Sequence, residues 1–161
     1  MTNLAKYSAT AVANAFIELA QRAGKTLTNM QLQKLVYIAF GYYAGFTHHR
    51  LFRDDIQAWN YGPVIPNLYH RLKIYGVGKV TVPLETDVPV IADSNEMQVI
   101  KGVWDAYGKY TAIQLSSLTH KEGTPWSYMW AKANGRKNVP IPFELIESHY
   151  ETLISERTHV N

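Results

Sequence analysis

The chain has 161 residues, 47% of them hydrophobic and 12% aromatic, which is enough to form a sizeable core, and it has no cysteine, which excludes disulfides and thiolate metal sites. Sixteen Lys and Arg against 13 Asp and Glu give a net charge of +3, which is smaller and more dispersed than nucleic-acid-binding surfaces usually carry. The start of the chain lacks an apolar run of signal-peptide length, and no window has the roughly 18 apolar residues of a membrane span, so we expect a soluble, cytoplasmic protein.

Two helices are predicted at the start of the chain. The first begins at Ser8, a typical N-cap, continues through apolar residues at helical spacing and ends at Gly24. The second covers residues 28–44, because Thr28 and Gln31 have the spacing of a capping box and apolar residues cover nearly its whole circumference. Such a helix is expected to be enclosed by neighbours on several sides, so we place it at the centre of the fold.

The middle of the chain mixes extended and helical signals. Alternation over residues 56–61 predicts a short strand, which a Gly-Pro pair ends. Pro63 and Pro66 bracket the expected first turn of another helix, which Gly76 stops. Valines alternate with prolines over residues 79–91, which favours a small two-stranded ribbon at an edge.

The C-terminal part carries four helix-start signals, each followed by apolar residues at helical spacing. They are Asp93 or Ser94, Thr111 with Gln114, Thr124 before Pro125, and Pro142. The predicted fold is therefore mainly α. We expect one compact helical domain over residues 1–161, with about seven helices around the central helix, a core over about residues 8–154, a frayed C-terminal tail and a small β excursion near residues 79–91.

The histidines do not have metal-site spacing. No His-Glu-x-x-His and no His-x-x-x-His is present. His48 and His49 are adjacent, so they would point about 100° apart on a helix and could chelate only weakly in a loop. We therefore expect no metal site.

Motifs for catalysis are also absent, since the chain has neither a Gly-x-Ser-x-Gly sequence nor a Gly-rich phosphate loop. We expect no enzyme and no cofactor. A small hydrolase built on His120 with Ser116 or Ser117 is one alternative. A nucleic-acid-binding regulator is another, based on the pI of about 9.0 and the basic patch at residues 48–53, although the central helix is too apolar to lie in a major groove.

Polar and aromatic residues gather at the junctions between predicted elements. They are Gln33 and Lys34 on the central helix, residues 59–63 at the strand-to-helix corner, and Thr119 and His120 ahead of Pro125 and Trp126. These side chains can tie loops to the core by satisfying buried backbone groups. They can also form a recognition surface, because Trp, Tyr and basic residues are common anchors in protein interfaces.

The same residues carry a resemblance to a known family, the Panacea domain of SocA-like antitoxins from bacteria and their prophages. Its helix motif is matched by Leu-Gln-Lys-Leu-Val-Tyr at residues 32–37, where Val36 replaces a leucine. Its corner motif is matched at residues 58–69, and its late motifs are matched at residues 115–120 and 125–126. We expect structural roles for the motif residues Leu32, Gln33, Gly62, Pro63, Val64, Thr119, His120 and Pro125.

The resemblance implies a non-enzymatic antitoxin that neutralises a toxin encoded beside it by direct protein contact. It also implies a variant role, since one branch of the family delivers its toxin to a AAA+ protease. The resemblance leaves the toxin's identity and the oligomeric state open. Our predicted partner-binding residues are Lys34, Trp59, Tyr61, Arg71 and Trp126.

Overall fold

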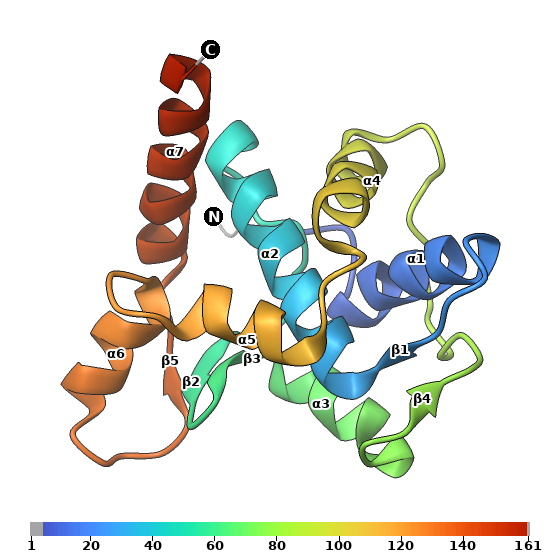
Figure 1. Ribbon diagram of the computed structural model, residues 1–161, viewed down its shortest axis with the longest axis horizontal. Helices are drawn as coiled ribbons and strands as arrows, with labels where there is room; N and C mark the ends of the chain where they lie inside the picture. The colour runs from blue at the N-terminus through green and yellow to red at the C-terminus, as the bar shows by residue number, and fades with distance from the viewer. Residues whose placement is uncertain (1–4, 161) are drawn as a thin grey trace.

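The computed structural model describes residues 5–160, and this part of the protein is mainly α with two small sheets (Figure 1). The ends of the predicted domain, residues 1–4 and 161, lie outside the described residues. The α-helices of the described part are α1 (Ala9–Arg22), α2 (Asn29–Thr47), α3 (Pro66–Leu72), α4 (Asn95–Tyr107), α5 (Ala112–His120), α6 (Pro125–Ala133) and α7 (Phe143–Val160). A 3-10 turn, Lys73–Tyr75, follows α3.

The strands are short and antiparallel. They are β1 (Leu27–Thr28), β2 (Gln57–Trp59), β3 (Gly62–Val64), β4 (Lys79–Val80) and β5 (Val139–Pro140). One sheet has the order β3-β2-β5, in which Ala58 pairs with both Pro63 and Val139. The second sheet joins β4 to β1.

The helix caps follow the sequence closely. Thr28 and Gln31 form the predicted capping box: the Thr28 N–H donates to Gln31 Oε1 at 2.9 Å and the Gln31 N–H donates to Thr28 Oγ1 at 3.3 Å. Side chains at the other predicted N-caps also accept backbone bonds, at Ser8, Ser94, Thr111 and Thr124. Seven helices are found among the described residues, as predicted, and the predicted starts of α1, α2, α4, α5 and α6 are confirmed, because a cap is a local interaction that sequence spacing specifies.

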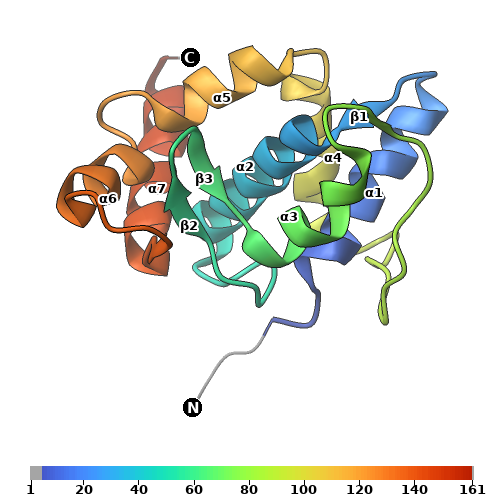
Figure 2. The ribbon, with the colours of Figure 1, turned by 90° about the horizontal axis from the view of Figure 1, so that it is seen from below.

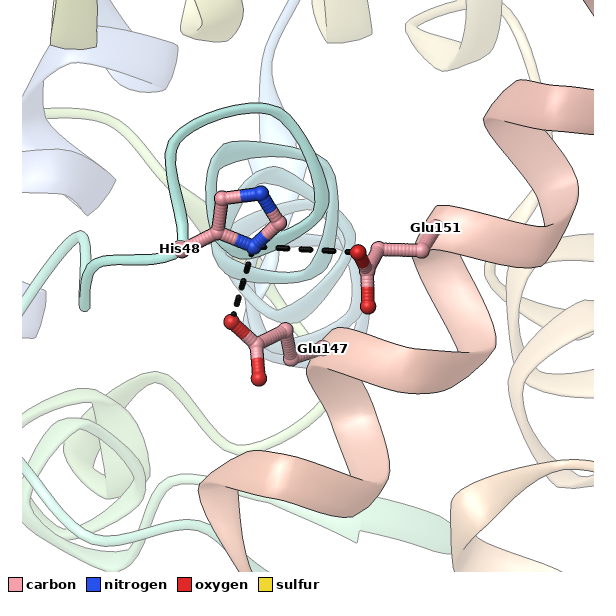
Figure 3. Close-up of side chains that lie close together, drawn as sticks. All are labelled: His48, Glu147 and Glu151. Carbon is pink, nitrogen blue, oxygen red and sulfur yellow. Dashed lines mark hydrogen bonds and ion pairs between the residues drawn. The ribbon is translucent and has the colours of Figure 1, made fainter.

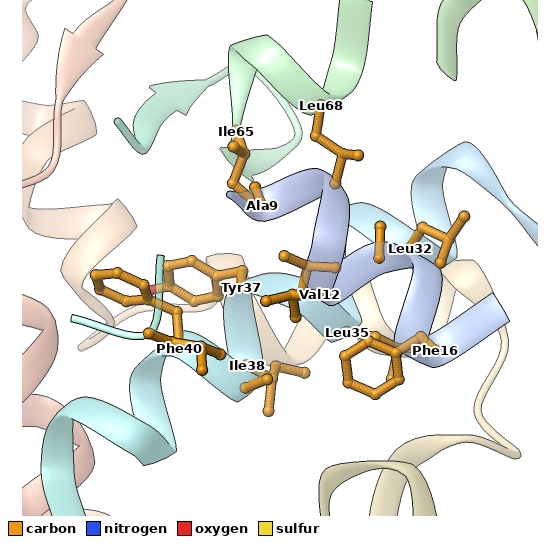
Figure 4. Close-up of a cluster of buried hydrophobic side chains, with 14 of the residues drawn as sticks. Ala9, Val12, Phe16, Leu32, Leu35, Tyr37, Ile38, Phe40, Ile65 and Leu68 are labelled. Atoms are coloured by element: carbon orange, nitrogen blue, oxygen red, sulfur yellow. The ribbon is translucent and has the colours of Figure 1, made fainter. Parts of the chain in front are cut away.

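The central helix α2 is enclosed by neighbours, as its composition predicted. It packs against α1, α3, α4, α5, α7 and β3, and Figures 1 and 2 show it running between these elements. Its buried side chains meet those of α1 and of the segment around α3 in one apolar cluster (Figure 4). The helix is longer than the predicted 28–44, because Gly45 continues it and His48 ends it in the left-handed conformation.

The predicted ribbon over residues 79–91 is wrong. Only Lys79 and Val80 form a strand there, and their partner is β1 rather than a second strand of the same segment. The rest of the segment is held by α1, since Asn14 Nδ2 donates to Leu84 O and the Leu84 N–H donates to Asn14 Oδ1, both at 2.7 Å. Pro83 and Pro89 lack the N–H that a strand ladder requires, which explains why pairing stops.

Two predicted helix boundaries also differ. Pro63 and Val64 belong to β3, so α3 begins at Pro66 and not in the turn before it. The tail after Ser155, predicted to be frayed, continues α7 to Val160. In the described residues, no helix is long and apolar enough to cross a membrane.

Candidate functional site

A pocket of about 750 Å³ opens between the N-terminal turns of α2, the β2–β3 turn and the end of α3. Its walls are largely apolar and aromatic, with several polar groups among them. The lining residues are Thr28, Asn29, Met30, Gln33, Lys34, Trp59, Asn60, Tyr61, Val64, Tyr69, Lys73, Gly76, Val77 and Ala112. The helix motif and the corner motif, which lie about 30 residues apart in the sequence, therefore meet at this pocket.

Lys34 is a buried cation in the wall of the pocket. Its side chain is only 2% exposed, and its Nζ donates to the backbone oxygen of Pro63 at 2.9 Å. None of the ion pairs found among the described residues involves Lys34. Burial lowers the pKa of Lys34 to about 8, because an ammonium group loses hydration there without gaining a carboxylate partner.

Gln33 and Gly62 complete the link between α2 and the hairpin. The Gln33 Oε1 accepts the Ile65 N–H at 3.0 Å, which fixes the chain just after β3. Gly62 has a φ of 121°, and a Cβ at this position would lie 3.0 Å from Lys34 Nζ. Both the backbone conformation and the close approach of the lysine therefore require glycine there.

The β2–β3 turn is also fixed from the other side. Ser116 Oγ on α5 donates to Tyr61 O at 2.9 Å, and Trp126 Nε1 on α6 donates to Trp59 O at 2.6 Å. With Lys34 on Pro63 O, three carbonyls of the turn region accept bonds from three different helices. The turn is thus held rigidly by buried donors.

Several large apolar side chains around the pocket are exposed. Tyr61 is 69% exposed, Val77 is 98% exposed and Met30 is 42% exposed. Trp59 and Tyr69 line the same pocket, with ring centroids 5.1 Å apart in an edge-to-face arrangement. We call these five pocket-lining residues, Met30, Trp59, Tyr61, Tyr69 and Val77, the hairpin face.

The structure brings together only part of the predicted partner-binding set. Lys34, Trp59 and Tyr61 line the pocket. Arg71 does not, and its guanidinium donates to Glu85 O at 2.6 Å instead. Trp126 is 8% exposed, and it supports the turn through its indole N–H while its ring stacks on Trp130 at 5.4 Å.

Three members of the hairpin face, Met30, Tyr69 and Val77, are absent from the predicted partner-binding set. Val77 stands between two glycines in a loop, and an isolated apolar residue in such a turn could have signalled a surface anchor. Tyr69 lies on the outward side of its predicted helix and within the corner motif, which could have indicated a surface role, whereas no local signal marks Met30.

The predicted motif residues have mainly structural contacts. Leu32, Gly62, Pro63, Val64 and Thr119 are buried, and Pro125 occupies the first turn of α6. Thr119 Oγ1 donates to the Leu115 and Ser116 carbonyls at 3.1 Å each.

Ser116 and His120, the residues of the alternative hydrolase, lie close together but form hydrogen bonds to the backbone. Ser116 Oγ lies 3.4 Å from His120 Nδ1, yet it donates to Tyr61 O at 2.9 Å. His120 Nδ1 also lies against the backbone oxygen of Ser116, so it is directed at a carbonyl as well as at the hydroxyl and is poorly placed to act as a base for Ser116. The pair stabilises the end of α5 and the β2–β3 turn.

The basic patch at residues 48–53 is not a free cationic surface. Arg50 donates to Phe52 O and Asp54 O, and its guanidinium lies 5.3 Å from the Phe40 ring centroid. Arg53 pairs with Asp87 at 3.5 Å. Since α2 is also buried along most of its length, no face of it is available to a DNA groove.

Comparison with known proteins identifies the family. A family model described as antitoxin SocA-like, Panacea domain, matches residues 32–127, which include both motifs at the pocket. The antitoxin SocA of Caulobacter vibrioides (strain NA1000 / CB15N) is 29% identical over 136 residues, covering 79% of this chain and 71% of the relative. No solved structure matches the chain. The protein therefore belongs to the SocA-like antitoxin family defined by the Panacea domain.

Proposed function

We propose that this protein neutralises a cognate toxin, encoded beside its own gene, by binding it directly through the hairpin face. The observation that carries this proposal is the convergence of two family motifs on a single pocket whose rim exposes Met30, Tyr61 and Val77. Large apolar side chains around a pocket are typical of protein interaction sites.

The rigidity of the turn supports a binding role. Lys34, Ser116 and Trp126 hold its carbonyls from within, so Tyr61 projects from a fixed backbone. A prearranged surface loses little conformational entropy when a partner binds, which raises affinity without new contacts. A complex of ordinary size buries about 1,200–2,000 Å² in total, so the face would supply the central anchors of a wider interface.

Lys34 gives the pocket its chemical preference. The ammonium has one acceptor, Pro63 O, and no anionic partner among the described residues. A carbonyl or carboxylate oxygen of the toxin that entered the pocket would therefore meet a buried cation, where electrostatic attraction is stronger than in water.

The test begins with the genes that flank the coding sequence. Each neighbour is expressed alone and then together with this chain, and we expect one neighbour to stop growth alone and to be tolerated in co-expression. The toxin should then co-purify with this protein. A set of neighbours of which none is toxic, or a toxic one that this chain does not rescue, contradicts the proposal.

The same assay separates direct occlusion from delivery to a protease. Neutralisation is repeated in host strains that each lack one AAA+ protease, with toxin levels followed by immunoblot. Direct occlusion predicts rescue in every strain with unchanged toxin levels. Delivery predicts that rescue fails, and that the toxin accumulates, in one of the strains.

A further inference from the structure

Three potential metal ligands meet where the C-terminal end of α2 lies against α7 (Figure 3). His48 Nδ1 lies 3.0 Å from Glu147 Oε2 and 3.7 Å from Glu151 Oε2. One donor atom from each of the three residues can be chosen so that all lie within 4.8 Å of one another. Figure 3 shows the imidazole directing one nitrogen between the two carboxylates while the other points away.

Both helices contribute to this arrangement. His48 is the C-cap of α2 and has a φ of 64°, and its backbone N–H donates to Ala44 O, so its Cα is fixed at the end of the helix. Glu147 and Glu151 are four residues apart on α7, so they lie one above the other on the same face. Because α7 packs along α2, this face meets the imidazole.

The charges of the cluster are not balanced by nearby lysines or arginines. Among the ion pairs of the described residues, both glutamates pair with His48 alone. The neighbouring Arg50 is directed elsewhere, toward Phe52 O and Asp54 O. Two adjacent carboxylates that share one imidazole keep a negative charge whether that imidazole is neutral or protonated, so a divalent cation would be attracted to them.

We propose that His48, Glu147 and Glu151 form a binding site for a divalent transition metal, with zinc as the best match. Zinc accepts histidine nitrogen and carboxylate oxygen at about 2.0–2.2 Å, which sets neighbouring donors about 3.4 Å apart in a tetrahedron. The distances from His48 Nδ1 to Glu147 Oε2 and Glu151 Oε2, 3.0 and 3.7 Å, lie on either side of that value. Calcium and magnesium prefer oxygen ligands only, so the imidazole disfavours them.

The expected role of the metal is structural. The ligands come from the end of α2 and from the middle of α7, so a bound ion would join the two helices. His48 has 60% of its side chain exposed, which leaves room for water to complete the coordination. The sequence led us to expect no metal site. Glu147 lies about 100 residues from His48, so these ligands do not form a short motif that can be detected in the sequence.

The test uses the full-length, untagged protein after treatment with a chelator and its removal. Zinc is titrated by calorimetry, and the thermal midpoint is measured with and without zinc. Cobalt, which gives a visible absorption band when bound by nitrogen and oxygen ligands, serves as a spectroscopic probe of the same site. We expect one equivalent of zinc to bind and to raise the midpoint, because a ligand that binds only the folded state stabilises it.

Two substitutions in the cluster and one control outside it identify the site. His48→Asn retains a residue that tolerates the left-handed conformation, and Glu151→Gln preserves the size of the side chain. Each should weaken zinc binding by at least about tenfold and abolish the shift in midpoint. His49→Ala is the matched control, because it removes an adjacent exposed histidine that lies outside the cluster, and its affinity should stay within about twofold of the wild type.

The variants are first compared without metal, so that a loss of folding is recognised by an altered midpoint of the metal-free protein. If His48→Asn is destabilised without metal, Glu147→Gln is used in its place, because it also removes one ligand. The proposal is overturned if zinc does not bind at millimolar concentration. It is also overturned if the variants in the cluster bind as tightly as the His49 control.

Discussion

At its N-terminal end, α2 is held by hydrogen bonds from buried polar side chains, whereas at its C-terminal end it is held by close packing of aromatic rings. Gln33 and Lys34 bind the backbone of the hairpin segment, and exposed apolar side chains surround that contact. Toward the other end, α7 approaches so closely that a Cβ on Gly41 would overlap the ring of Tyr150.

The difference shows how one helix can serve both stability and recognition. Aromatic packing buries apolar surface and stabilises the fold, although Phe46 remains exposed at this end. Hydrogen bonding fixes the hairpin with fewer side chains, so Tyr61 and its neighbours remain exposed. We therefore expect substitutions at the C-terminal end to change stability, and substitutions of the hairpin face to change binding.

The largest effect on stability is expected at Gly41. A Cβ on this residue would lie 2.2 Å from Tyr150 Cε2, and the buried ring is confined by Tyr37 and Tyr42. Gly41→Ala should lower the free energy of unfolding by about 3 kcal/mol, measured by urea denaturation. Gly102→Ala on α4 is the control, because its Cβ would meet nothing within 4 Å, and it should be stabilising by about 0.5–1 kcal/mol. Equal effects of the two substitutions would contradict the packing argument.

A substitution of Tyr61 should separate binding from stability. Tyr61 is 69% exposed, so Tyr61→Ala should barely change the unfolding free energy but should weaken toxin binding by about 2 kcal/mol, or roughly 30-fold. Phe46→Ala is the control, because Phe46 is 58% exposed at the opposite end of α2. Affinity is measured on the co-purified toxin. A larger loss of affinity for Phe46→Ala than for Tyr61→Ala would show that the toxin binds at the C-terminal end of α2 instead.

The buried lysine should make stability depend on pH. Because folding lowers the pKa of Lys34 from 10.5 to about 8, the unfolded chain binds more protons between these values and stability rises with pH. From about pH 7.5 to about pH 9.5 the gain attributable to Lys34 should be about 2 kcal/mol. Burial raises the pKa of Tyr37 and Tyr150, which opposes this trend only above about pH 10.

Lys34→Met tests whether Lys34 causes this rise in stability with pH. The variant should lose the rise in stability over the same pH range, as measured by urea denaturation at both pH values, since it retains the tyrosines and lacks the titrating ammonium. A rise of equal size in Lys34→Met would show that another group is responsible.

The smallest effect is expected from a hydroxyl at the aromatic end. Tyr37 Oη is buried and has no hydrogen-bond partner in the described structure, so Tyr37→Phe should be neutral or stabilising by about 1 kcal/mol. Tyr42 Oη lies 2.9 Å from Tyr107 Oη, so Tyr42→Phe should instead be destabilising by about 1 kcal/mol. The thermal midpoints of the two variants should move in opposite directions or differ clearly. Identical shifts would contradict the conclusion that the Tyr42 hydroxyl has a hydrogen-bond partner and the Tyr37 hydroxyl does not.

The sequence by itself determined the helices and, except for α3, most of their beginnings. Thr28 with Gln31, and Thr111 with Gln114, are capping boxes in the structure because both partners lie within one turn of the chain. The apolar circumference of α2 likewise predicted its enclosure, since a helix without a polar face must be covered. The antitoxin family was identified from motif residues that the structure places largely in the core and the hairpin.

Only the tertiary structure decided which of these residues face a partner and how distant segments pair. Trp59 and Trp126 were both predicted from the sequence to bind a partner. In the structure Trp59 lines the pocket, whereas Trp126 is a buried hydrogen-bond donor, because exposure depends on what packs against each ring. β4 pairs with β1 across some 50 residues, and His48 meets Glu147 across about 100. Contacts of this kind have no local spacing, since they arise from the packing of whole elements around α2.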